Sequence, residues 1–203
     1  MSKLRNLKSL LFLMAIFLSG CLPSTKEGTK QEEKGPLVVF LVRHAEKATD
    51  SMEKDSQLTE EGYIRATELA RTLADAEIGY VHSSDYIRTR NTAAPVADLF
   101  ELEMELYATS DLHDLADTIK ARGGRHLVVG HSNTTPAMVE ILGGKPGVPI
   151  VEATEYDRLY ILTITNDEVN TVLLRYGKPC SSELSSISAS SLLVPHTSGS
   201  ALN

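Results

Sequence analysis

Two arginines and two histidines are the side chains of this sequence that could together do chemistry on an anion. They are Arg43, His44, Arg88 and His131. A guanidinium group offers paired N–H donors that fit the oxygens of a phosphoryl group. A neutral imidazole can attack phosphorus, and a protonated imidazole can neutralise charge on the oxygens of the transferred group. If the fold brings the four side chains together, they form a site for phosphoryl chemistry that requires no metal ion and no cofactor.

Each of these side chains lies just after a segment with the pattern of a strand. The apolar run 37–42 leads into the Arg-His pair, and the run 127–129 leads into the second histidine. A short strand over 78–82 precedes the helix whose first turn carries Arg88. The carboxyl ends of parallel strands meet at one edge of a sheet, where ligands bind in open α/β folds. We therefore expect the four side chains at that edge, on condition that the three strands are neighbours.

The remaining chain alternates between helical and strand patterns. The last two runs, 158–165 and 168–176, flank Asn166 and predict an antiparallel hairpin. The expected fold is a three-layer α/β/α sandwich with a mostly parallel central sheet and an antiparallel edge. We further expect a strand over 102–107 and helices that begin at the N-cap Thr59, at the cap Asp85 with a kink or break at Pro95, at Asp111, and at Thr134 or Thr135.

Residues 1–20 have the features of a signal peptide. Three basic residues precede a short apolar run that ends at Leu18, and this run is too short to span a bilayer. The sequence Leu18-Ser19-Gly20-Cys21 resembles the processing site of bacterial lipoproteins, which implies cleavage before Cys21 and a lipid on its thiol. The implied product is an exported lipoprotein on the extracytoplasmic side of a membrane, the outer membrane if the organism has one. A plain signal peptide with a chance cysteine is the alternative.

Charge and composition divide the rest of the chain. Without the signal peptide, 17 basic and 27 acidic residues remain, a net charge of −10, which argues against nucleic acid as a partner and leaves the lipid as the contact with the membrane. Residues 21–36 are the lipidated cysteine and a polar tether, 37–177 are the catalytic domain, and 178–203 are a Ser-rich tail expected to be disordered. Cys180 has no partner for an internal disulfide once Cys21 is lipidated, and we expect it to be a bystander.

The sequence contains four short motifs, three of which hold the two arginines and the two histidines. They are Leu41-Val42-Arg43-His44-Ala45-Glu46, Leu58-Thr59-Glu60-Glu61-Gly62, Ser83-Ser84-Asp85-Tyr86-Ile87-Arg88 and Val128-Val129-Gly130-His131-Ser132-Asn133. In type and order they resemble the motifs of the histidine phosphatase superfamily, also called the phosphoglycerate mutase-like superfamily. The resemblance implies a phosphoglycerate mutase-like fold and a phosphatase that hydrolyses a phosphomonoester, or another small phosphorylated substrate or phosphoprotein, through a phosphohistidine on His44. It also implies that Arg43, Arg88 and His131 bind the phosphoryl group, with Ser132 as an accessory donor.

One part of the family pattern is missing. Many members carry a glutamate between the second and third motifs that protonates the leaving oxygen, and this sequence has no such motif. Glu101, Glu103 and Glu105 lie in an alternating strand and are expected to face solvent. Asp111 is a better-placed general acid, although capping of the next helix is its more ordinary role. The pattern is closer to the small phosphohistidine phosphatases and predicts weak activity on unactivated alkyl phosphates.

Two other interpretations stay open. Gly130-His131-Ser132 begins like the nucleophile elbow of a serine α/β-hydrolase, but Thr134 stands where the second glycine is required. In that enzyme the downstream histidine would have to be His196, in the tail. The other interpretation is a non-catalytic lipoprotein that binds phosphate or another anion, because no general acid is evident.

Overall fold

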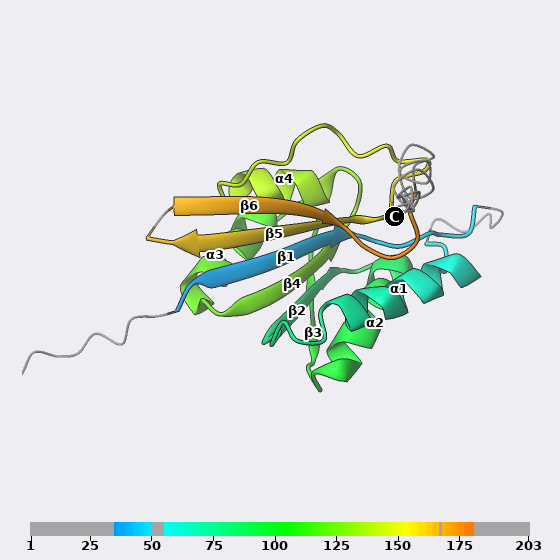
Figure 1. Ribbon diagram of the computed structural model, residues 1–203, viewed down its shortest axis with the longest axis horizontal. Coiled ribbons are helices and arrows are strands. Elements are labelled where there is room, and N and C mark those ends of the chain that lie inside the picture. Colours follow the sequence, from blue (N-terminus) through cyan, green and yellow to red (C-terminus); the bar gives the residue numbers. More distant parts are fainter. Residues whose placement is uncertain (1–34, 50–54, 167, 181–203) are drawn as a thin grey trace, which may run out of the picture. The chain divides into compact units, whose positions relative to one another are not determined.

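The computed structural model describes residues 35–49, 55–166 and 168–180. Within these ranges the chain forms one six-stranded sheet with the order β3-β2-β4-β1-β5-β6 (Figure 1). The first four strands pair in parallel, and β5 and β6 form the antiparallel edge, as the sequence predicts. The strands are β1 (Leu37–Arg43), β2 (Tyr80–Ser84), β3 (Met104–Tyr107), β4 (Arg125–Gly130), β5 (Arg158–Thr165) and β6 (Glu168–Arg175).

Strand β4 lies between β1 and β2, which meets the condition on which the predicted site depends. Arg43 at the end of β1 is in register with Gly130 at the end of β4, and Ser83 near the end of β2 is in register with Val129. The three strands therefore end side by side, and the segments that follow them leave from the same edge of the sheet.

In the part of the chain that the structure describes, four helices cover the two faces of the sheet. They are α1 (Glu60–Thr72), α2 (Ile87–Leu99), α3 (Leu112–Arg122) and α4 (Thr134–Ile141). Phe40 and Val42 of β1 pack with α1 and α2, whereas Val39 and Leu41 pack with α3 and α4. Because successive side chains of a strand point to opposite faces, a strand covered on both sides is apolar throughout. This confirms the three-layer sandwich and explains the uninterrupted run in β1.

Helix α2 differs from the prediction at its N-cap, and it lacks the break at Pro95 that was one of the two expected outcomes. Pro95 lies inside it, yet the helix continues to Leu99, since its buried residues Ala93, Val96 and Ala97 pack into the core. This packing offsets the helix-breaking tendency of proline. The predicted cap Asp85 is also wrong: the N-cap is Tyr86, and the carboxylate of Asp55 accepts the Ile87 amide at 2.9 and 3.1 Å.

Several predictions concern residues outside the described ranges. The signal peptide, Cys21, most of the tether, and the tail beyond residue 180 with His196 all belong to this group. Among the residues that the structure does describe, no helix is long and apolar enough to cross a membrane.

Candidate active site

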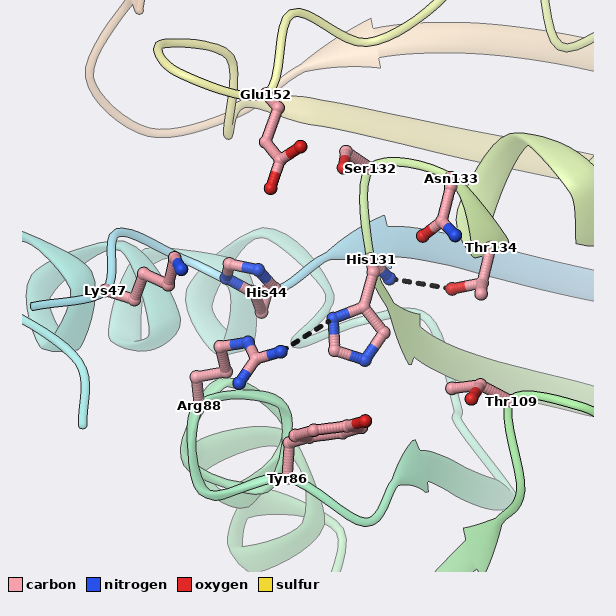
Figure 2. A pocket seen from close by; sticks show the side chains of 10 residues that line it. All are labelled: His44, Lys47, Tyr86, Arg88, Thr109, His131, Ser132, Asn133, Thr134 and Glu152. Atoms are coloured by element: carbon pink, nitrogen blue, oxygen red, sulfur yellow. Dashed lines mark hydrogen bonds between the residues drawn. The ribbon is translucent and has the colours of Figure 1, made fainter. Parts of the chain in front are cut away.

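A pocket of about 470 Å³ opens where β1, β2 and β4 end (Figure 2). Most of its lining is polar, and it contains both predicted histidines. The lining residues are His44, Lys47, Tyr86, Arg88, Thr109, His131, Ser132, Asn133, Thr134 and Glu152. Arg43 is packed beneath this surface, and its side chain is 1% exposed.

His44 has the tautomer and the charge that a nucleophile requires. Its Nδ1 lies 2.7 Å from the carbonyl oxygen of Ala45, so Nδ1 carries the proton and Nε2 keeps a lone pair. Burial lowers the pKa of His44, the Ala45 hydrogen bond raises it, and the charges of Arg43, His131 and Arg88 lower it; the result is a pKa of about 3. The imidazole is therefore neutral at physiological pH.

Arg43 presents buried donors that have no partner among the described residues. Its Nη1 donates to the carbonyl oxygen of Glu155 at 2.9 Å, and its guanidinium carbon lies 4.1 Å from the centre of the Tyr156 ring. Nε and Nη2 are buried without a hydrogen-bond acceptor in the described part of the chain. An unpaired buried donor costs about 1–3 kcal/mol, and more when it is charged. Donors kept in this state are suited to an anionic ligand.

Arg88 and His131 are in contact with each other and both line the pocket. The first turn of α2 carries Arg88, and its Nη2 donates to Nδ1 of His131 at 3.4 Å. Because arginine cannot accept, Nδ1 is unprotonated in the neutral ring, and Nε2 donates to the Ser84 hydroxyl at 2.9 Å. Burial first, and then the charges of Arg88 and Arg43, lower the pKa of His131 to about 4.

The fold thus places His44, His131 and the two arginines around one site. The centroids of the two imidazole rings are 5.4 Å apart in an edge-to-face arrangement. Ser132 also lines the pocket, in the loop that leads to α4.

Asp111 does not join the other predicted site residues. It is exposed at the N-cap position of α3 and is absent from the pocket lining, where Thr109 is the nearest contributor in sequence. Its side chain makes no capping hydrogen bond either. The structure therefore supports neither role that the sequence suggested for this residue.

An ion pair between Arg65 and Glu46 supports the loop that follows His44. Arg65 is 4% exposed and donates to both carboxylate oxygens of Glu46, two residues after His44. It also donates to the carbonyl oxygen of Tyr176 and, at 3.3 Å, to the sulfur of Cys180. Burial raises the pKa of the Cys180 thiol, which disfavours the reactive thiolate, and the residue lies outside the catalytic pocket.

Sequence reasoning missed Glu152 and Tyr156, both in the loop between α4 and β5. Glu152 lines the pocket, and Tyr156 stacks on Arg43. The loop carries no motif and no hydrophobic periodicity. Its charged residues, Glu152 and Glu155 among them, follow no spacing that could have marked them as part of a site.

Comparison with protein families gives one match. A model described as the histidine phosphatase superfamily (branch 1) matches residues 39–116, a range that includes Arg43, His44 and Arg88. A search of curated proteins gives no match.

Comparison with solved structures shows the same fold in several phosphatases. The protein histidine phosphatase SixA in complex with tungstate is 21% identical, with a TM-score of 0.57, over 71% of this chain and 98% of that chain. A structure described as a phosphohistidine phosphatase SixA from Agrobacterium tumefaciens is 22% identical, with a TM-score of 0.54, over 71% and 99%. A mycobacterial glucosyl-3-phosphoglycerate phosphatase is 12% identical, with a TM-score of 0.54, over 71% and 100%.

Proposed function

Because a model of the histidine phosphatase superfamily matches residues 39–116 and the fold is that of several phosphatases, we propose that the protein is a phosphatase that hydrolyses its substrate in two steps through a phosphohistidine on His44. The observation that carries the proposal is the state of Arg43. Its charged side chain is almost fully buried next to the nucleophile, and two of its N–H groups have no acceptor in the described protein. A phosphoryl group supplies the oxygens that these donors lack.

In the first step, Nε2 of His44 attacks phosphorus. The N–P bond forms while the bond from phosphorus to the leaving oxygen or nitrogen breaks, and the leaving group departs with the electron pair and takes up a proton. Arg43 and Arg88 stabilise the negative charge on the transferred phosphoryl group, and His131 faces the same oxygens. In the second step, water attacks phosphorus, the N–P bond breaks, and inorganic phosphate leaves neutral His44 behind.

The pocket favours leaving groups that depart without strong acid assistance. No buried carboxylate lines it within the described ranges, so the arrangement lacks the kind of environment that raises the pKa of a general acid. Phosphorylated imidazoles and activated phosphoesters are the substrates that need such help least. The likeness to proteins described as histidine phosphatases agrees with this class.

Rapid-quench labelling tests the proposed intermediate. The purified protein is mixed with a phosphate-labelled aryl phosphate and quenched in alkali, and we expect acid-labile, alkali-stable label on His44. The His44→Gln variant should take up no label, whereas His113→Gln, which changes an exposed histidine of α3, should label normally. A protein that takes up no label from a broad panel of phosphorylated substrates, and yet retains phosphate, would instead be the anion-binding lipoprotein.

Ser132→Ala separates this mechanism from that of a serine hydrolase. We expect the variant to keep much of its phosphatase activity, since the serine is an accessory donor at most. Abolished activity together with normal folding would favour the hydrolase.

For localisation we propose an exported lipoprotein anchored by the lipid on Cys21. Metabolic labelling with palmitate should modify the wild-type protein and the Cys180→Ser control, and it should fail with Cys21→Ser. Labelling of the Cys21→Ser variant would contradict the anchor.

A further inference from the structure

Glu152 is the one carboxylate among the described residues that line the catalytic pocket. It belongs to the loop between α4 and β5, and its side chain is exposed. Figure 2 shows the Glu152 side chain reaching towards the pocket from the side opposite Arg88 and Tyr86, with His44 between them in this view. A negative charge at this point opposes the binding of a phosphoryl group, so its presence requires another explanation.

The loop holds Glu152 in a defined place. Val151 and Glu155 close a turn around it, since the Glu155 amide donates to the Val151 carbonyl oxygen at 2.8 Å. The Glu155 carboxylate in turn accepts the Val151 amide at 2.9 Å and pairs with Arg158 and Arg175. Burial raises the pKa of Glu155, but these hydrogen bonds prevail and lower it to about 2, so the carboxylate keeps its charge and its partners.

The charge of Glu152 acts on Arg43 from a distance, without direct pairing. Arg43 and Arg88 flank the two histidines, and the charge of Lys47 also acts on His131. No ion pair within the described ranges joins Glu152 to any of them. The Glu152 carboxylate is therefore available to the substrate.

The direction of attack indicates which part of the substrate Glu152 meets. His44 attacks phosphorus in line with the departing bond, so the leaving group extends away from His44 towards the open side of the pocket. Glu152 is exposed, whereas a carboxyl group that acts as a general acid is usually buried so that it keeps its proton. Charge recognition is thus the role that the surroundings of Glu152 favour.

We propose that Glu152 selects substrates whose leaving group carries a positively charged substituent, such as a protonated amino group. This specificity rests on the proposed function, because it concerns the leaving-group side of the same site. The same carboxylate repels leaving groups that carry a negative charge. Arg43 and Arg88 bind the phosphoryl group in every case.

Three para-substituted aryl phosphates provide the test. 4-(Aminomethyl)phenyl, 4-ethylphenyl and 4-(carboxymethyl)phenyl phosphate differ chiefly in charge and have phenol leaving groups of similar reactivity. Wild-type protein, Glu152→Gln and Glu103→Gln are compared through kcat/KM for each ester. Glu103 is a matched control because it is an exposed glutamate directly before β3, at the opposite edge of the sheet from the pocket.

We expect the wild type to prefer the cationic ester over the neutral one, and the neutral one over the anionic one. Glu152→Gln should lower the ratio of cationic to neutral kcat/KM by about 1.5-fold to fivefold, the size expected of one exposed charge pair. Glu103→Gln should keep the wild-type ratio. High salt should reduce the wild-type preference and leave that of Glu152→Gln nearly unchanged.

Two results would overturn the inference while the phosphatase mechanism stands: an unchanged ratio in Glu152→Gln, or an equal loss of kcat/KM on all three esters, which would make Glu152 a proton donor. Failure of the proposed function looks different. In that case the wild type hydrolyses none of the three esters and forms no phosphohistidine.

Discussion

The guanidinium of Arg43 is stacked on the ring of Tyr156, with 4.1 Å between its central carbon and the ring centre. More than a hundred residues of sequence separate the two side chains. The stack and the hydrogen bond to the Glu155 carbonyl oxygen fix the guanidinium plane. This fixed plane leaves Nε and Nη2 as the free donors. The loop before β5 therefore belongs to the proposed phosphate-binding site, although it contains none of the motifs.

Removal of the Tyr156 ring should weaken phosphate binding. We expect Tyr156→Ala to lower kcat/KM on an aryl phosphate by roughly tenfold, because a partly desolvated cation–π contact contributes about 1–2 kcal/mol. Tyr156→Phe keeps the ring and should retain most of the activity. Steady-state kinetics measure both effects, and thermal denaturation shows whether each variant is folded. Equal losses in the two variants would show that the hydroxyl, not the stack, matters.

His131 should take up a proton when an oxyanion binds. In the free protein its pKa is lowered to about 4, so the ring is neutral at physiological pH. A bound dianion beside it favours the charged form and raises that pKa. Between the two values, binding is coupled to proton uptake, and affinity increases as the pH falls.

Calorimetry with molybdate at neutral pH measures this uptake. The apparent binding enthalpy should depend on the ionisation enthalpy of the buffer for the wild type. His131→Asn should abolish most of that dependence and bind more weakly. A buffer-independent enthalpy in the wild type would mean that His131 stays neutral in the complex.

The residues at strand ends were predictable because their signals are local. The run 37–42 is apolar on both faces, and this pattern fixes β1 and hence the place of His44. The run 127–129 does the same for β4 and His131. Parallel strands joined through helices then place both histidines at one edge. Sequence periodicity captured these elements because their burial is regular.

Residues in irregular loops were not predictable for the opposite reason. Asp85 has the local position of a helix cap, yet its carboxylate pairs with Arg90 while Asp55, from a distant loop, accepts the helix amide. Glu152 reaches the pocket because Glu155 pairs with Arg158 in β5 and with Arg175 in β6. Such contacts depend on the completed fold, and no spacing of residues in the sequence indicates them.

The glycine of the motif at the start of α1, Gly62, is required by a close backbone contact, and this requirement can be tested. A Cβ atom at this position would lie 2.3 Å from the carbonyl oxygen of Glu46, the same oxygen that accepts the Thr59 amide. Helix α1 thus approaches the backbone of Glu46, two residues after His44, so closely that only glycine fits. We expect Gly62→Ala to destabilise the protein by about 1–3 kcal/mol and to lower kcat/KM through displacement of His44.

Gly79→Ala is the matched control, because its added Cβ would be 3.7 Å from the nearest atom, the Arg125 carbonyl oxygen. Urea denaturation and aryl phosphate kinetics on both variants check the prediction. Normal stability and activity in Gly62→Ala would show that α1 can shift without moving the active-site loop.

The buried pair His82 and His126 should make stability depend on pH. Nε2 of His126 donates to the Gly123 carbonyl oxygen at 2.9 Å, so its Nδ1 is free to accept from Nε2 of His82 at 3.0 Å. Burial, and then the neighbouring His126, lower the pKa of His82 to about 4; burial also lowers that of His126. Both rings are therefore neutral in the folded protein at neutral pH.

The sign of the effect follows from proton binding. An unfolded histidine titrates near pH 6.5, so below that value the unfolded chain binds more protons than the folded one. Stability is complete above about pH 6.5 and is lost as the pH falls towards 4. His82 alone should account for about 2 kcal/mol of this loss near pH 5.

His82→Gln keeps a donor for His126 and should show a flatter dependence of the unfolding free energy on pH in urea denaturation. The exposed-site variant His113→Gln should keep the wild-type slope. A slope that His82→Gln leaves unchanged would mean that His82 has the same protonation in the folded and unfolded states. The loss at low pH would then belong to His126 and to the active-site residues His44 and His131.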